Sequence, residues 1–241
     1  MCGIVGYTGT GQAKDVLLEG LKRLEYRGYD SAGIAVFDGD KLNIVKRLGK
    51  VSELVDAVSS DQCSGTCGIG HTRWATHGAP SERNAHPHTS CADDIAVVHN
   101  GIIENFTELR EELIAKGHTF VSDTDTEVAA HLVEEGYNGN LLEAVRYAAS
   151  RLVGAYGLAV TCEQEPGTIV VTRKDSPIVL GSSEKGSYVA SDIIAVIEAT
   201  RDVVIMEDNQ FAVMTPRGFH ITINKEKQLR LKLLMLIGIS M

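Results

Sequence analysis

The second residue of the chain is a cysteine, and this position indicates a specific chemistry. A methionine followed by a small residue is the usual substrate for methionine removal, which would leave Cys2 with a free α-amine. An α-amine titrates near about 7.7–8.0 and a thiol near about 8.5, so the two groups are matched for proton transfer. The amine can then serve as general base for its own thiol. The competing interpretation is a small buried cysteine in a first strand, which is a common fate of this residue.

Further polar residues lie where strand-like segments end. Arg73 closes an apolar segment and enters a long loop over 74–93, a position that favours a binding site over an ordinary surface cation. Asn100-Gly101 follows another apolar segment and, taken alone, is typical of a turn. Asp125 follows a candidate helix cap, and two roles stay open for it: a favourable charge at the positive end of a helix, or a carboxylate presented to a ligand.

Histidines and cysteines crowd the region from 63 to 99, which raises the question of a metal site. Cys63-x₃-Cys67 has no matching second pair, and His86-Pro87-His88 is not a usual zinc spacing. We therefore expect no metal from these residues: His71, His77, His86, His88, His99, Cys63, Cys67 and Cys91.

The elements that position these residues follow from the apolar pattern. Helices are expected at 13–26, 51–59, 106–116, 126–136 and 141–151, and capping-box pairs precede the last three: Asn105 with Glu108, Thr124 with Glu127, and Asn140 with Glu143. Strands are expected at 3–8, 32–37, 42–48, 66–73, 94–100, 155–162, 168–173, 178–181, 187–190, 202–206, 210–215 and 218–223. Helices and strands are grouped, which predicts an α+β fold with antiparallel sheets.

Composition narrows the function classes. The 241 residues contain 23 Lys plus Arg and 32 Asp plus Glu, a net charge of −9, which argues against a nucleic-acid-binding face. No apolar run reaches the roughly 20 residues that a membrane helix needs, and the N-terminus does not resemble a secretory signal, so we expect a cytoplasmic protein. Five cysteines are an odd number, which does not indicate a disulfide framework.

Five motifs in a fixed order carry a family resemblance: MCGIVG at 1–6, YRGYDSAG at 26–33, HTRWATHG at 71–78, HNGIIEN at 99–105 and DTDTE at 123–127. Together they resemble the type 2 glutamine amidotransferases, most closely the glutaminase domains of glucosamine-6-phosphate synthases. The resemblance implies a four-layer αββα N-terminal-nucleophile hydrolase fold with two stacked antiparallel sheets. It weakens over the last 15 or so residues.

The resemblance also implies roles for individual residues. Cys2 would be the nucleophile that attacks the side-chain amide of glutamine. The Asn100 side chain and the Gly101 N–H would form the oxyanion hole, Arg73 would hold the α-carboxylate, and Asp125 would hold the α-ammonium.

Four more residues receive supporting roles from the same resemblance. Thr76 and His77 would add substrate contacts, Trp74 would lie in a loop that closes over the substrate, and Arg27 would lie just behind the nucleophile. No metal or organic cofactor is implied.

The implied reaction converts glutamine to glutamate and ammonia through a thioester on Cys2. In the family, ammonia passes to fructose 6-phosphate in a separate sugar isomerase domain, and the full-length enzyme is expected to be a homodimer. Residues 2–225 would form the glutaminase domain, and 226–241 an atypical tail where a linker to the absent isomerase domain would begin.

Two alternatives stay open. The glutaminase half of phosphoribosylpyrophosphate amidotransferases shares the N-terminal Cys and an Arg-Gly-x-Asp-Ser-Ala-Gly pattern, but Trp74-Ala75-Thr76-His77 fits the sugar-phosphate enzymes better. If Met1 is retained, the amine of Cys2 becomes a peptide amide without useful basicity, and the chain would be a silent glutamine-binding module.

Overall fold

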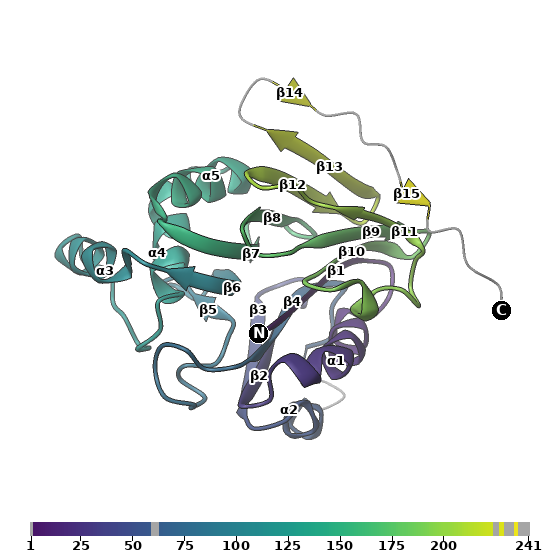
Figure 1. Ribbon diagram of the computed structural model, residues 1–241, viewed down its shortest axis with the longest axis horizontal. Helices are drawn as coiled ribbons and strands as arrows, with labels where there is room; N and C mark the ends of the chain where they lie inside the picture. Colours follow the sequence, from purple (N-terminus) through teal and green to yellow (C-terminus); the bar gives the residue numbers. More distant parts are fainter. Residues whose placement is uncertain (1, 59–62, 224–226, 229–233, 236–241) are drawn as a thin grey trace.

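Two antiparallel sheets stack face to face, and helices cover their outer faces (Figure 1). The computed structural model describes residues 2–58, 63–223, 227–228 and 234–235. Within these residues the first sheet has the order β15-β11-β9-β10-β1-β4-β2-β3, and the second has the order β14-β13-β12-β8-β7-β6-β5. This is the α+β, four-layer arrangement that the sequence predicted.

The first sheet contains β1 (Gly3–Gly9), β2 (Ser31–Phe37), β3 (Leu42–Leu48), β4 (Cys67–Arg73), β9 (Val179–Ser183), β10 (Gly186–Ala190), β11 (Asp202–Ile205) and β15 (Leu234–Met235). The second contains β5 (His88–Thr89), β6 (Ile95–Ile103), β7 (Gly154–Cys162), β8 (Ile169–Lys174), β12 (Gln210–Thr215), β13 (Gly218–Ile223) and β14 (Lys227–Gln228). The helices are α1 (Ala13–Leu24), α2 (Val51–Ala57), α3 (Phe106–Ala115), α4 (Glu127–Gly136) and α5 (Leu141–Arg151), with short 3₁₀ turns at η1 (Glu25–Arg27) and η2 (Ile193–Ala195).

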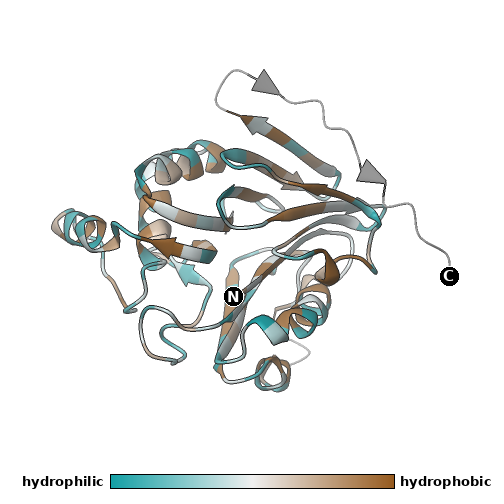
Figure 2. Ribbon diagram, viewed as in Figure 1, coloured by the Kyte–Doolittle hydropathy of each residue, from teal (hydrophilic) through white to brown (hydrophobic). Residues whose placement is uncertain are grey.

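The central strands of each sheet are buried on both faces, which explains why they read as nearly continuous apolar runs. Successive side chains of a strand point to opposite faces. In β1, Ile4 therefore joins the core between the sheets, whereas Val5 packs under α1 and α2. In β6, Val98 faces the other sheet and Val97 packs under α4 and α5. Figure 2 shows the hydrophobic residues along the stacked strands.

The predicted strands and helices are found with small shifts at their ends. Helix α1 stops at Leu24 and continues as the turn η1, and the strand expected at 94–100 runs on through Gly101 to Ile103 as β6. The expected loop contains the short strand β5, paired with β6. Of the expected tail 226–241, most lies outside the described residues, which include only β14 and β15, paired with β13 and β11.

One of the three predicted capping residues makes its side-chain hydrogen bond to the helix. Asn140 accepts a hydrogen bond from the N–H of Glu143 at 3.1 Å. Asn105 precedes α3 but its side chain bonds the backbone between α5 and β7 instead. Thr124 is not the cap of α4, and Glu127 turns back to accept N–H groups of the preceding segment. At Asn105 and at Thr124, a hydrogen bond to a residue distant in the sequence replaces the predicted cap.

Among the described residues, no helix has the length and apolar character that crossing a membrane requires.

Candidate active site

Cys2 lies immediately before β1, in the middle of the first sheet. Its Sγ accepts a hydrogen bond from the N–H of Trp74 at 3.2 Å, and the thiol lies 3.5 Å from the carbonyl oxygen of the same residue. Burial raises the pKa of the Cys2 thiol, although the Trp74 N–H opposes this shift. At neutral pH the sulfur therefore needs a base before it can act as a nucleophile.

The side-chain amide of Asn100 is fixed beside Cys2 by His71. His71 Nε2 lies 3.0 Å from Asn100 Oδ1, and Asn100 Nδ2 donates to the backbone oxygen of Cys2 at 3.1 Å. Burial lowers the pKa of His71 to about 3, so the ring is neutral. Because an amide oxygen can only accept, Nε2 carries the ring proton. The amide N–H of Asn100 is thereby directed toward Cys2.

Gly101 follows with a backbone conformation that only glycine accommodates. Its φ is +133°, and a Cβ at this position would lie 2.0 Å from the carbonyl oxygen of Ala155 on the neighbouring strand β7. This glycine lets β6 continue past the site, where Asn100-Gly101 in isolation indicated a turn. The pair therefore lies within a strand and lines the cavity beside Cys2.

A narrow polar cavity opens beside Cys2, and Arg73 is buried in its wall. The side chain is 4% exposed, and Nη2 donates to the backbone oxygens of His77 and Gly78. Nη1 is buried and has no hydrogen-bond partner among the described residues. Burial lowers the pKa of Arg73, and Asp30 opposes the shift. A buried cationic donor without a partner is costly, which makes this position suited to an anionic ligand group.

Asp125 lines the same cavity and supplies the opposite charge. It is 5% exposed, and its Oδ2 accepts the N–H of Ile103 at 2.9 Å. Helix α4 begins two residues later at Glu127, so both interpretations of Asp125 hold: it lies close to a helix start and it faces the cavity. With Arg73 it gives the cavity a cation and an anion, the complement of a zwitterion.

Trp74, in the loop after Arg73, contacts Cys2 through its backbone, whereas the sequence predicted that its loop closes over the substrate. The backbone of Trp74 contacts the Cys2 thiol, whereas its indole is 48% exposed and packs edge-on against Tyr29, with ring centroids 5.4 Å apart. Closure of this side chain over a substrate stays a prediction. Thr76 and His77 both line the polar cavity.

Arg27 lines a second, wider cavity of about 460 Å³ that also opens on Cys2. Its guanidinium pairs with Asp192, and its Nε donates to the Tyr26 hydroxyl at 2.9 Å. Cys2 and Gly101 line both cavities, so the sulfur lies where the polar cavity meets the wider one. The structure thus brings every predicted site residue to one of these two cavities.

The sequence prediction assigned no role to Asp30, which shapes the site. Its Oδ2 accepts the N–H of Ala75 and its own N–H donates to the oxygen of Arg73 at 3.2 Å. Gly28 lies so close that a Cβ there would stand 2.7 Å from the carbonyl carbon of Arg73. Both belong to the YRGYDSAG motif, which was the available signal. This motif holds the backbone that carries Arg73 and Trp74.

The crowding of histidines predicted from the sequence is present as a stack of buried rings. The rings of His71 and His86 lie 4.1 Å apart, and those of His86 and His88 lie 4.8 Å apart. His99 Nδ1 lies 2.8 Å from Thr126 Oγ1. Burial lowers the pKa of all four histidines, so they are neutral side chains packed beneath the cavity.

Comparison with known proteins shows which family the chain is similar to. A profile of the family described as "Glutamine amidotransferase domain" matches residues 71–198, more than half of the chain. The chain is 54% identical over 222 residues to the glutamine–fructose-6-phosphate aminotransferase (isomerizing) of Thermus thermophilus, covering 92% of the chain and 37% of that protein. It is 48% identical over 230 residues to the enzyme of the same name from Clostridium tetani, covering 95% of the chain and 38% of that protein.

A solved structure with similar architecture is the glutamine phosphoribosylpyrophosphate amidotransferase of B. subtilis, with a TM-score of 0.81 and 27% identity over 94% of the chain and 50% of that protein. The chain therefore spans less than two-fifths of the curated relatives that it matches and half of this structural neighbour. The profile match extends from His71 to Glu198 and includes Arg73, Asn100 and Asp125. The chain belongs to the glutamine amidotransferase domain family.

Proposed function

We propose that this chain hydrolyses the side-chain amide of glutamine, with Cys2 as the nucleophile after removal of Met1. The observation that carries the proposal is the buried, unpartnered Nη1 of Arg73 in the cavity that also holds Asp125 and opens on Cys2. A free amino acid presents an α-carboxylate and an α-ammonium, which this pair matches. The amide carbon of glutamine would then extend toward the sulfur.

The chemistry proceeds by general base catalysis from the α-amine of Cys2. The amine accepts the thiol proton, and the sulfur attacks the δ-carbon of glutamine. The resulting oxyanion accepts hydrogen bonds from Asn100 Nδ2 and the Gly101 N–H; one such donor is worth about 10²–10³ in rate. As the C–N bond breaks, the ammonium returns its proton to the leaving nitrogen, which departs as ammonia and leaves a thioester on Cys2.

The same amine completes the cycle with water. It takes a proton from a water molecule as the oxygen attacks the thioester carbon, and it returns that proton to the departing sulfur of Cys2. Glutamate leaves and the thiol is restored. His71 acts by holding the Asn100 amide in place. No cofactor is required by this sequence of steps.

The curated relatives are longer enzymes that share the name glutamine–fructose-6-phosphate aminotransferase (isomerizing), and on this similarity we extend the proposal to a larger enzyme. We infer that the ammonia aminates fructose 6-phosphate on a sugar isomerase domain, with residues 2–225 as the glutaminase domain and a linker beginning in 226–241. We also infer a cytoplasmic, homodimeric full-length enzyme. The chain is 48% and 54% identical to these relatives and 27% identical to the phosphoribosylpyrophosphate amidotransferase. This difference favours fructose 6-phosphate over phosphoribosylpyrophosphate as the acceptor of ammonia.

The test compares glutamate release from glutamine by the untagged chain with that of Cys2→Ala. Intact-mass measurement of the same samples reports whether Met1 is present. We expect a chain without Met1 to be active, Cys2→Ala to be inactive, and the matched control Cys63→Ala, a buried thiol far from the cavity, to retain activity.

Equal rates for the native chain and Cys2→Ala would refute the nucleophile. If Met1 is absent and glutamine binds without turnover, the proposal is also wrong and the chain is a binding module. If Met1 is retained and the chain is inactive, cleaving Met1 enzymatically should restore turnover, and failure to do so refutes the role of the amine.

A further inference from the structure

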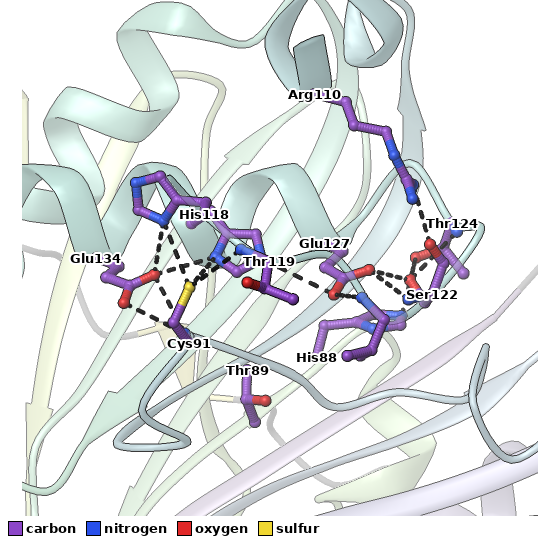
Figure 3. A network of polar contacts seen from close by, with 12 residues as sticks. His88, Thr89, Cys91, Arg110, His118, Thr119, Ser122, Thr124, Glu127 and Glu134 are labelled. Carbon is purple, nitrogen blue, oxygen red and sulfur yellow. Dashed lines mark hydrogen bonds and ion pairs between the residues drawn. The ribbon is translucent and has the colours of Figure 1, made fainter. Parts of the chain in front are cut away.

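A second cluster of reactive side chains lies away from the cavities described above. Cys91 follows β5, His118 follows α3, and His131 and Glu134 lie one turn apart on α4. One ligand atom of each of these four residues lies within 4.8 Å of the ligand atoms of the other three. Figure 3 shows Cys91, His118 and Glu134 turned toward one another. Three separate segments of the chain therefore bring four potential metal ligands to one point.

The distances between these atoms fit a small tetrahedral ion. Cys91 Sγ lies 3.7 Å from His118 Nδ1 and 3.6 Å from His131 Nδ1. Glu134 Oε2 lies 3.0 Å from each of the same two nitrogens. Tetrahedral Zn²⁺, with bonds of about 2.3 Å to sulfur and about 2.0–2.1 Å to nitrogen and oxygen, places its ligand atoms roughly 3.3–3.6 Å apart. The four distances given above lie within a few tenths of an ångström of these values.

The groups around the cluster also suit a bound cation. The N–H of Thr119 points at Cys91 Sγ at 3.5 Å, a contact that stabilises a thiolate. His131 is 1% exposed, and its other ring nitrogen, Nε2, has no hydrogen-bond partner in the described part of the chain. That nitrogen lies 3.8 Å from Glu127 Oε1. A carboxylate behind a ligating imidazole orients the ring and increases its basicity.

An ion pair between protonated His131 and Glu134 explains one of these contacts without a metal. It does not explain why a second imidazole contacts the same carboxylate oxygen, or why a thiol lies beside both imidazoles. The two imidazole rings lie with their centroids 5.0 Å apart, and each presents its Nδ1 to the same carboxylate oxygen. A divalent cation at this point would bind both nitrogens.

We propose that Cys91, His118, His131 and Glu134 form a structural zinc site. The donor set of one thiolate, two imidazoles and one carboxylate is that of Zn²⁺. The histidines that the sequence grouped with Cys91 are not its partners, because those lie in the stack beneath the cavity. The ligands are separated by up to 43 residues, so spacing along the chain did not reveal them. Exposed Cys91 gives the ion a route from solvent.

The zinc would tie the turn after β5 to helix α4 and to the segment between α3 and α4. That segment is also held by Glu127, whose carboxylate accepts the N–H groups of Val121 and Ser122 at 2.7 Å each. Asp125 lies between these anchors. Loss of the ion would therefore loosen the segment that carries the acidic group of the cavity, without touching Cys2 or Arg73.

The test measures zinc directly. Untagged Cys2→Ala protein, which lacks the half-buried thiol of the cavity, is exchanged into metal-free buffer, and bound metals are quantified by plasma mass spectrometry. We expect one zinc per chain and, after replacement by Co²⁺, the absorption of tetrahedral cobalt with a thiolate ligand. In competition with a chromophoric chelator, Cys91→Ser and His118→Gln should each weaken zinc binding by more than about 100-fold, and Glu127→Gln by about 10- to 100-fold.

The matched control is Cys63→Ser, which removes a thiol from outside the cluster and should keep full zinc binding. Circular dichroism establishes that each variant is folded, and zinc should raise the unfolding temperature of the chelator-treated chain but not that of folded Cys91→Ser. Less than stoichiometric zinc in Cys2→Ala, no cobalt–thiolate band, or equal affinity in Cys91→Ser would each overturn the proposal.

Discussion

Lowering the pH from about 7.5 to about 5 should destabilise the folded chain by about 2 kcal/mol through His71 alone. Burial holds the pKa of this ring at about 3, against 6.5 for an ordinary histidine. Between these values the unfolded chain binds a proton that the folded chain excludes, so the free energy of unfolding falls as pH falls. At about pH 5 the interval below 6.5 is about 1.5 units, which at about 1.36 kcal/mol per unit gives this loss.

The magnitude depends little on the folded pKa, because any value well below 5 leaves the ring neutral at that pH. Solvent does not screen the ring and so does not reduce this loss of stability, because His71 is fully buried. The loss begins below about pH 6.5, increases as the pH falls, and ends near pH 3. His86, His88 and His99 are also shifted downward by burial and add to the loss in the native chain.

The assay compares urea unfolding of the native chain and of His71→Gln at both pH values, followed by circular dichroism. Glutamine does not titrate and retains an N–H donor toward Asn100. Whatever its stability at about pH 7.5, the variant should lose about 2 kcal/mol less than the native chain on acidification. His220→Gln is the matched control, because this side chain on β13 is exposed in the folded chain. Equal losses in the native chain and His71→Gln would refute a neutral, buried ring.

Three further predictions concern the residues beside Cys2. Gly101→Ala should lower the free energy of unfolding, measured with urea, by about 3 kcal/mol or more, because its Cβ would lie 2.0 Å from the Ala155 oxygen. Its control is Gly39→Ala, where no atom lies within 4 Å of the added Cβ and the positive φ alone should cost about 1–2 kcal/mol. Asn100→Ala should lower kcat for glutamine by about 10²–10³ and leave KM nearly unchanged, and an unchanged kcat would exclude an oxyanion role. Arg73→Lys should raise KM by about 10-fold or more, because an ammonium cannot form the paired contacts of a guanidinium; an unaltered KM would remove its carboxylate role.

The elements were predictable from the sequence because strands buried on both faces produce long apolar runs, and helices over one face produce the 3.6-residue pattern. The five motifs likewise identified the residues that meet at Cys2. The contacts that orient them were not predictable. His71 reaches Asn100, and Asp30 reaches Ala75, only because the sheets stack in one particular alignment, which no local pattern encodes.

The incorrect capping predictions have the same origin. Thr124 and Asn105 have the local pattern of caps, but His88 and the α5–β7 connection compete for their side chains once the chain is folded. Local chemistry predicts what a side chain can bond, and tertiary packing decides which partner it obtains.

The proposed nucleophile and its proposed amide donor belong to different sheets of the molecule. Cys2 precedes β1 of the first sheet, Asn100 lies on β6 of the second, and the bond from His71 on β4 crosses between them. The distance between the Cys2 sulfur and the Asn100 amide therefore depends on how the two sheets are aligned. A small slip in the interface between them, caused by a substitution such as Val171→Ala far from any ligand, would separate donor from nucleophile and slow the reaction while glutamine still binds.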